Sequence, residues 1–128
     1  MLVDTSTIVE ILRHSRTSDR FKLIKEQLGS EELYVLIVQL AELSDWCIKN
    51  KVSPRDRIEA VKRFANIVPL DEEVCLEGSK IKSERRAGGH RDFSLLDGLV
   101  LATAKILGER LLTFDEDFSG EKDCIVLA

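Results

Sequence analysis

Short apolar segments alternate with longer segments of helical periodicity along almost the whole chain, and this alternation limits the fold more than any other feature. Strands are expected at LVD near the start, at 32–38 (ELYVLIV), at 111–114 (LLTF) and at 123–127 (DCIVL). Apolar residues at helical spacing fill the segments between them. Strands that alternate with helices are typical of a parallel sheet covered on both faces. We therefore predict an α/β protein with a central parallel sheet.

The helices are predicted from apolar spacing and from the residues at their ends. In the segment SPRD, Ser53 supplies an N-cap, Pro54 the first helical position and Asp56 an acid at the third position. Gly29 and Gly108 are placed to end two other helices. The expected helices cover residues 6–13, 18–28, 39–50, 53–66, 71–86 and 94–108.

Length and composition fit one domain that spans residues 1–128. A chain of 128 residues can bury roughly two-thirds of its unfolded surface. Its 44% hydrophobic and 33% charged residues are typical of a globular protein. The start of the chain does not resemble a signal peptide, and the longest apolar stretch, LLDGLVLATAKIL, is too short to cross a bilayer. We therefore expect a cytoplasmic protein.

Cysteine and histidine usage argues against a disulfide framework or a zinc site. Cys47, Cys75 and Cys124 are odd in number, widely spaced and free of any CxxC pair. Such cysteines are expected to be small core residues in a reducing compartment. The two histidines, His14 and His90, are too few for a His-rich metal site.

Charge is distributed unevenly along the chain. The formal net charge of −4, from 19 basic and 23 acidic residues, argues against a protein that coats nucleic acid by bulk charge. However, segment 80–91 (KIKSERRAGGHR) holds five Lys or Arg against one Glu, and segment 13–20 is also basic. Such a run is either a solvated helix face or a rim that holds phosphates. Under the second interpretation, the candidate phosphate ligands are Arg85, Arg86 and Arg91.

Four acidic residues occupy similar places in the alternation of strands and helices. Asp4 and Asp115 follow predicted strands, while Glu42 and Asp97 are expected in the first turns of their helices. The carboxyl ends of the strands in an open parallel sheet line one edge, and ligands bind in the crevice at that edge. All four carboxylates can therefore point into one crevice.

Each of these acids also has an ordinary structural explanation. Asp4 can cap a helix, the helix dipole favours an acid such as Glu42, and Ser94 with Asp97 resembles a capping box. For Asp97 this explanation is weaker, because its helix is apolar nearly all round and should be buried. No basic residue lies one turn away on that face. An unpaired carboxylate there costs several kcal/mol to ionise, so a cation is an attractive partner.

The segment DEDF at 115–118 supplies three acids in one turn. Asp115 follows the strand most directly and is favoured as the fourth acid of the crevice. Asp117 stays open as the alternative, whereas Asp92 is expected to be a loop or cap residue.

Three segments of the chain, MLVDTSTIVEIL, VQLAEL and FSLLDGLVLATAKILGERLLTFDEDF, resemble the PIN-domain ribonucleases. The similarity is greatest to small VapC-like toxins of type II toxin–antitoxin pairs. Its most specific part is the ordered run D-G-L-V-L-A-T-A-x-x-x-G-x-x-L-L-T-x-D-x-D-F at 97–118. The region between Lys49 and Arg91 follows no motif of the family.

The resemblance implies a single PIN domain, a three-layer α/β/α sandwich around a parallel sheet, and RNA cleavage that depends on Mg²⁺ or Mn²⁺. It places the catalytic and metal-binding acids at Asp4, Glu42, Asp97 and Asp115. Ser6 and Thr113 match the polar residues that support those acids. The resemblance also implies an antitoxin partner and a homodimer.

The residue chemistry is compatible with this implication. Carboxylates are hard oxygen ligands that suit Mg²⁺ or Mn²⁺, and such ions make hydroxide available near neutral pH for attack on a phosphodiester. A receiver domain would need paired acids after the first strand, and a haloacid-dehalogenase-type phosphatase would need D-x-D, but Thr5 and Ser6 follow Asp4. The alternative that stays open is a non-catalytic PIN-like module that binds RNA or protein. A lost acid would favour it, and none of the four is missing.

Overall fold

The computed structural model describes residues 1–13 and 18–127. Its centre is a five-stranded parallel sheet with the strand order β3-β2-β1-β4-β5. The strands are Leu2–Val3 (β1), Leu33–Leu36 (β2), Ala65–Val68 (β3), Leu111–Thr113 (β4) and Cys124–Val126 (β5). The helices are Thr5–Leu12 (α1), Asp19–Leu28 (α2), Ile37–Lys49 (α3), Pro54–Phe64 (α4), Glu72–Ala87 (α5) and Leu95–Leu107 (α6), and Glu116–Phe118 forms a short 3₁₀ turn (η1).

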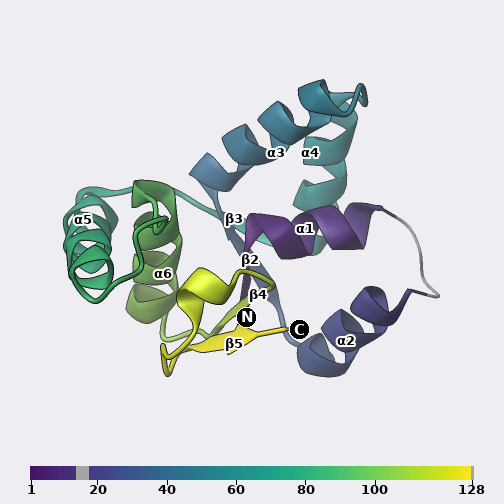
Figure 1. Ribbon diagram of the computed structural model, residues 1–128. Coiled ribbons are helices and arrows are strands. Elements are labelled where there is room, and N and C mark those ends of the chain that lie inside the picture. Colours follow the sequence, from purple (N-terminus) through teal and green to yellow (C-terminus); the bar gives the residue numbers. More distant parts are fainter. Residues whose placement is uncertain (14–17, 128) are drawn as a thin grey trace.

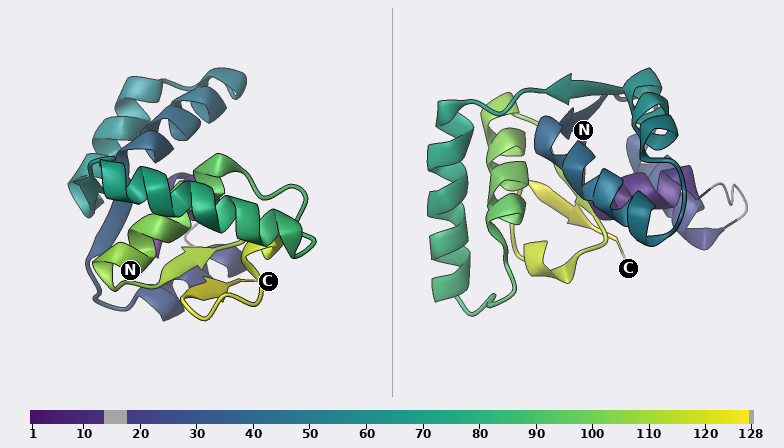
Figure 2. Two further views of the ribbon diagram at one scale, coloured as in Figure 1. Left: turned by 90° about the vertical axis from the view of Figure 1, so that its left-hand side faces the viewer. Right: turned by 90° about the horizontal axis from the view of Figure 1, so that it is seen from above.

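The sheet divides the apolar core into two clusters. Figures 1 and 2 show α5 and α6 together on one side of the sheet and α1, α3 and α4 on the other. Successive strand residues point to opposite faces, so Leu2 packs with α5 and α6 while Val3 packs with α1, α3 and α4. Leu111 and Leu112 of β4 divide in the same way. The predicted three-layer α/β/α sandwich is confirmed.

The boundary between β2 and α3 differs from the prediction. The expected strand at 32–38 is too long, because α3 begins at Ile37 directly after β2. The side chain of Gln39 makes this abrupt change possible: its Oε1 accepts from Leu36 N at 2.8 Å, and its Nε2 donates to the Val3 carbonyl at 2.8 Å. Glu42 therefore lies in the second turn of α3, not in the first.

The edge strand β3 is also absent from the prediction. The helix expected over 53–66 ends at Phe64, and Ala65–Val68 pairs in parallel with β2. The predicted cap of this helix is correct, since Ser53 Oγ accepts from Asp56 N at 3.3 Å. The chain enters β3 straight from α4, without the glycine or turn residue that usually marks such a boundary.

Two glycines set the distance between α5 and α6. A Cβ on Gly98 would come within 2.3 Å of the Gly78 carbonyl oxygen, so the two helices touch through their backbones here. At the other end of α6, Gly108 has a φ of 67° and closes the helix in the left-handed conformation. The contact at Gly98 holds the first turn of α6 close to α5, and Gly108 ends the helix.

The cysteine prediction holds for two of the three positions. All three thiols are free, and Cys47 is buried while Cys124 is half-buried. The prediction is wrong for Cys75, which lies on the solvent side of α5 and is exposed. His14 and part of the basic segment 13–20 lie outside the described residues. None of the described helices is both long enough and apolar enough to traverse a membrane.

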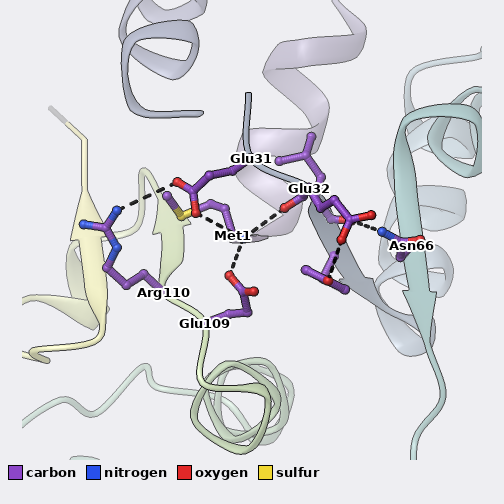
Figure 3. A network of polar contacts seen from close by, with 8 residues as sticks. Met1, Glu31, Glu32, Asn66, Glu109 and Arg110 are labelled. Carbon is purple, nitrogen blue, oxygen red and sulfur yellow. Dashed lines mark hydrogen bonds and ion pairs between the residues drawn. The ribbon is translucent and has the colours of Figure 1, made fainter. Parts of the chain in front are cut away.

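A polar network joins the amino ends of three neighbouring strands (Figure 3). The α-amino group of Met1 donates to the Glu32 carbonyl at 3.0 Å and pairs with Glu109 Oε2 at 2.5 Å. Glu31 lies 3.8 Å from the same ammonium and 3.9 Å from the Arg110 guanidinium. These residues precede β1, β2 and β4, so the network lies at the amino edge of the sheet, opposite the carboxyl edge.

Candidate active site

An open cleft of about 380 Å³ lies at the carboxyl edge of the sheet. It is lined by Asp4, Thr5, Ser6, Val9, Glu10, Arg20, Glu42, Trp46, Asp97 and Asp115. The four acids singled out in the sequence therefore come together, although they belong to four separate segments of the chain.

Asp4 links the end of β1 to the start of α1. One carboxylate oxygen, Oδ1, accepts from the Thr5 amide at 2.8 Å and so caps α1. The other, Oδ2, accepts from Thr113 Oγ1 at 2.7 Å and from Ser6 Oγ at 3.3 Å. The residue is only 7% exposed, so these bonds fix the direction of its carboxylate.

The hydroxyls of Thr113 and Ser6 also hold the segment that follows β4. Thr113 Oγ1 accepts from the Asp115 amide at 2.9 Å, and Ser6 Oγ accepts from the Phe114 amide at 3.3 Å. Both hydroxyls thus touch Asp4 and the Asp115 segment at once. Each hydroxyl can therefore help to orient Asp4 and Asp115 relative to each other.

Glu42 approaches the centre from α3 and is held by a residue that the sequence analysis did not identify. Thr5 Oγ1 donates to Glu42 Oε1 at 2.5 Å and lies 3.5 Å from Gln39 Nε2, which can donate to it. Gln39 is fully buried. A signal for both residues existed: Thr5 stands between Asp4 and Ser6, and Gln39 is the one amide in the apolar run LIVQL.

Asp97 caps its own helix and faces the cleft at the same time. Its Oδ2 accepts from Ser94 N at 2.8 Å, and its amide donates to Ser94 Oγ at 3.0 Å, as the capping box predicts. Its Oδ1 accepts no hydrogen bond from any residue in the described ranges. The structural and the functional interpretations of Asp97 are therefore compatible, because they use different oxygens.

Asp115, not Asp117, lines the cleft. Asp115 Oδ1 accepts from the Asp117 amide at 2.9 Å and caps η1. Asp117 lies close enough for its charge to act on Asp97. The geometry thus favours Asp115 as the fourth acid.

The carboxylates of the cleft interact unfavourably with one another. Burial raises the pKa of Asp4, Glu42 and Asp97, and in each case neighbouring carboxylates raise it further. The hydroxyl of Thr113 acts in the opposite direction on the pKa of Asp4. In the described part of the chain, no Lys or Arg forms an ion pair with any of the four acids. Among the residues that the structure describes, the four acids therefore have no basic partner within ion-pair distance.

These residues suit a hydrated divalent cation. Across residues 1–13 and 18–127, no three His, Cys, Asp or Glu side chains are arranged to hold a metal ion by themselves. Mg²⁺ does not need such a cage, because it keeps several waters and binds through one or two carboxylates plus substrate phosphates. An ion of this kind would offset the repulsion between carboxylates that adds to the effect of burial on the three pKa values. The donor set therefore fits Mg²⁺ or Mn²⁺.

The three arginines predicted to hold phosphates do not line the cleft. The side chain of Arg85 is only 12% exposed: it donates to the carbonyls of Asp117 and Ser119 and lies 3.6 Å from Glu121. These contacts tie α5 to the segment after β4 and favour a structural role for Arg85. Arg86 is exposed, although its Nε donates to the Phe93 carbonyl at 2.8 Å, and Arg91 is exposed in the loop before α6.

Two further side chains of the cleft, Arg20 and Trp46, were not predicted. Arg20 belongs to the basic segment 13–20, but only the fold brings α2 to the cleft. Trp46 follows Glu42 by four residues on α3, so helical spacing alone places both on one face. That spacing is the signal by which Trp46 could have been found.

The family model described as PIN domain matches residues 1–120. The chain therefore belongs to the PIN domain family. No curated protein matches the chain in a sequence comparison.

Several solved structures contain a chain with the same fold. A toxin–antitoxin complex from Klebsiella pneumoniae is 17% identical with a TM-score of 0.76, covering 98% of this chain and 95% of that one. VapBC2 from Rickettsia felis, bound to a promoter DNA fragment, is 16% identical with a TM-score of 0.74, covering 98% and 96%. FitAcB from Neisseria gonorrhoeae is 24% identical with a TM-score of 0.71, covering 99% and 96%. This PIN domain is thus similar in fold to a chain of each of these three structures along 98–99% of its length.

Proposed function

We propose that this PIN domain is an endoribonuclease that depends on Mg²⁺ or Mn²⁺. One observation carries the proposal: Asp4, Glu42, Asp97 and Asp115 converge on one cleft and have no ion-pair partner among the described residues. A structural role would require such acids to be neutralised by the protein itself. Their uncompensated charge instead favours a bound cation as the partner.

In this proposal, the four carboxylates hold the cation, and the hydroxyls of Thr5, Ser6 and Thr113 orient them. When bound, Mg²⁺ or Mn²⁺ would lower the pKa of a water molecule and stabilise the oxygen that leaves the phosphodiester. Asp115 is placed beside the Asp4 carboxylate through Thr113, so we assign it to a second ion or to orientation of the attacking water. Oriented acids matter because residues that fix the ligands affect metal affinity strongly. The chain needs no side-chain nucleophile for this reaction.

We further propose that the protein is the toxin of a toxin–antitoxin pair and forms a homodimer. The support is its similarity in fold to chains of three toxin–antitoxin complexes. An antitoxin segment that places a basic side chain among Asp4, Glu42 and Asp97 would neutralise the site. Expression of this chain alone should slow bacterial growth, and co-expression with the neighbouring open reading frame should restore it. Sedimentation of the purified chain tests the dimer.

The competing proposal is a PIN-like module that binds RNA or protein without cutting. A panel of structured RNAs incubated with Mg²⁺, Mn²⁺, Ca²⁺ or a chelator separates the two. We expect cleavage with Mg²⁺ and Mn²⁺, poor cleavage with Ca²⁺ and none with the chelator. In an Asp97→Asn variant, cleavage should be reduced by orders of magnitude. RNA that stays intact with all three ions, in a preparation that binds them, would favour the non-catalytic module. Harmless expression of an active nuclease would exclude only the toxin role.

A further inference from the structure

The cleft extends beyond the four carboxylates, between α1, α2 and α3. Val9 and Glu10 of α1, Arg20 of α2 and Trp46 of α3 line this extension. None of these four side chains has a role in the proposed hydrolysis. They combine an apolar wall, an aromatic ring and a cation directly beside the acidic centre.

Trp46 offers a fixed aromatic surface in this extension. It lies one helical turn after Glu42 on α3, so both side chains face the same part of the cleft. The indole is half-buried and packs against the apolar cluster beneath α1 and α3, which limits its rotation. Its Nε1–H has no hydrogen-bond partner in the described part of the chain. An aromatic ring held in this way stacks readily on an unpaired base.

Among the described residues that line the cleft, Arg20 is the one basic side chain, and it is held to one side of the acids. Its guanidinium lies 4.8 Å from the centre of the Phe114 ring, and Nη1 donates to Glu10 Oε1 at 3.0 Å. Phe114 directly precedes Asp115, so the cation sits beside the centre without pairing with its carboxylates. Glu10 uses one of the five N–H groups of the guanidinium. The side chain is 57% exposed, which leaves the planar fork accessible to a phosphate.

From this arrangement we infer that Trp46 and Arg20 form a nucleotide subsite next to the acidic centre. A base of the RNA stacks on the Trp46 indole, and a neighbouring backbone phosphate binds the Arg20 guanidinium. The inference rests on the proposed function for the identity of the ligand, since RNA is the substrate proposed above. It goes further by naming the residues that position the strand and the state of the strand that they accept.

The subsite requires a single-stranded nucleotide. A base within a duplex is stacked on both faces, and its ring is not available to a side chain. A cleft of carboxylates alone would repel the phosphates of any RNA, and Arg20 would reduce this repulsion. With Arg20 at the rim, the phosphate next to the reacting one meets a positive charge.

The sequence contains a single tryptophan, so the emission of Trp46 reports directly on this subsite. The experiment titrates the full chain with an eight-nucleotide single-stranded RNA in Ca²⁺, where cleavage is slow, and with the same strand annealed to its complement. We expect the single strand to quench the emission and the duplex to leave it nearly unchanged. Polarisation of the end-labelled single strand should show about tenfold weaker binding for Trp46→Leu and near-normal binding for Trp46→Phe.

Each variant has a matched control: Ile48 shares helix α3 with Trp46, and Arg13, the C-cap residue of α1, is a second exposed arginine beside Glu10. Ile48 is 66% exposed on α3 and lies outside the cleft, so Ile48→Ala should bind as the wild type does. Arg20→Gln should weaken binding several-fold and reduce the slope of log affinity against log salt by about one. Arg13 is 62% exposed and also approaches Glu10, at 3.8 Å, but it does not line the cleft, so Arg13→Gln should keep the wild-type slope.

Unchanged emission with the single strand, together with wild-type binding by Trp46→Leu, would overturn the subsite even if the protein cuts RNA. Equal quenching by the duplex would overturn the requirement for a single strand. Quenching by the single strand in a protein that cuts no RNA with Mg²⁺ or Mn²⁺ would support the subsite and contradict the nuclease proposal. The two failures are therefore distinguishable.

Discussion

Thr113 donates a hydrogen bond from Oγ1 to Oδ2 of Asp4 at 2.7 Å, across the ends of two neighbouring strands. Strands β1 and β4 pair in parallel with Val3 opposite Leu112, so the next residue along each strand meets at the carboxyl edge. The same hydroxyl accepts from the Asp115 amide. One buried oxygen thus contacts both the carboxylate of Asp4 and the backbone of Asp115.

Replacing Thr113 by valine removes this hydroxyl and keeps the shape of the side chain. Asp4 loses a bond that lowers its pKa, and the Asp115 amide loses its acceptor. We predict a loss of about 1–3 kcal/mol in the free energy of unfolding and roughly 10- to 100-fold weaker Mn²⁺ binding by calorimetry. Thr103→Val is the control, because Thr103 is equally buried but bonds only the Leu99 carbonyl of α6. Equal Mn²⁺ affinity in the two variants would contradict the role given to Thr113.

The raised pKa values predict how the stability of the metal-free protein depends on pH. The ordinary pKa is 3.8 for Asp4 and Asp97 and 4.5 for Glu42, and burial raises the pKa of all three in the folded state. Their folded forms therefore bind protons more tightly than the unfolded chain does. Their contribution to stability is fully present below the ordinary pKa values and is lost as pH rises through the raised ones.

This prediction is tested by chemical denaturation at a series of pH values, from pH 4 upward in steps of about one unit. As pH rises, the wild type should lose more unfolding free energy than Asp97→Asn does, because the variant lacks one of the groups that ionise. Stabilisation by millimolar Mn²⁺ should instead increase as pH rises over the same range, since the ion binds the charged carboxylates. A wild-type protein that gains stability relative to Asp97→Asn as pH rises, without metal, would contradict the direction of the shift.

Arg85 and Arg91 should behave differently although both belong to the basic segment 80–91. Arg85→Gln removes a nearly buried guanidinium from two carbonyls, so we predict a loss of about 2 kcal/mol in unfolding free energy. Arg91→Gln should change stability by less than about 0.5 kcal/mol. If Arg91 holds a phosphate, as the sequence predicts, its loss should reduce the salt slope of RNA binding by about one. An unchanged slope would leave Arg91 as a solvated loop residue with no phosphate contact.

The network at the amino edge should affect stability but not the cleft. Glu109 pairs with the α-amino group of Met1 and is 28% exposed, so Glu109→Gln should cost about 1 kcal/mol. The pair joins the amino ends of β1 and β4 (Figure 3), whereas Asp4 and Asp115 follow the carboxyl ends of the same strands. Mn²⁺ affinity and RNA cleavage should therefore match the wild type. Reduced Mn²⁺ affinity in a folded Glu109→Gln protein would show that the two edges are coupled.

The sequence predicts the architecture and the meeting of the acids because both depend on the order of strands and helices. Asp4 and Asp115 follow strands, and that order alone brings them to the carboxyl edge. It misses β3, where a helix passes into a strand with no turn residue, and it places Glu42 one turn early because Gln39 starts α3 sooner than periodicity suggests. Side-chain partners between distant segments, such as Thr5 with Glu42 or Arg85 with the Asp117 carbonyl, depend on tertiary geometry that no local pattern encodes.

Asp97→Asn gives the most direct measurement of the central claim, that the acids hold a cation for RNA cleavage. Asparagine keeps an oxygen that can accept from Ser94 N, so the cap and the fold should be retained. Metal-free melting and Mg²⁺-dependent RNA cleavage are measured on one preparation of the variant and one of the wild type. We predict a variant at least as stable as the wild type without metal, with cleavage reduced by orders of magnitude. A variant that is destabilised yet cuts RNA at the wild-type rate would contradict the claim and leave Asp97 as a helix cap alone.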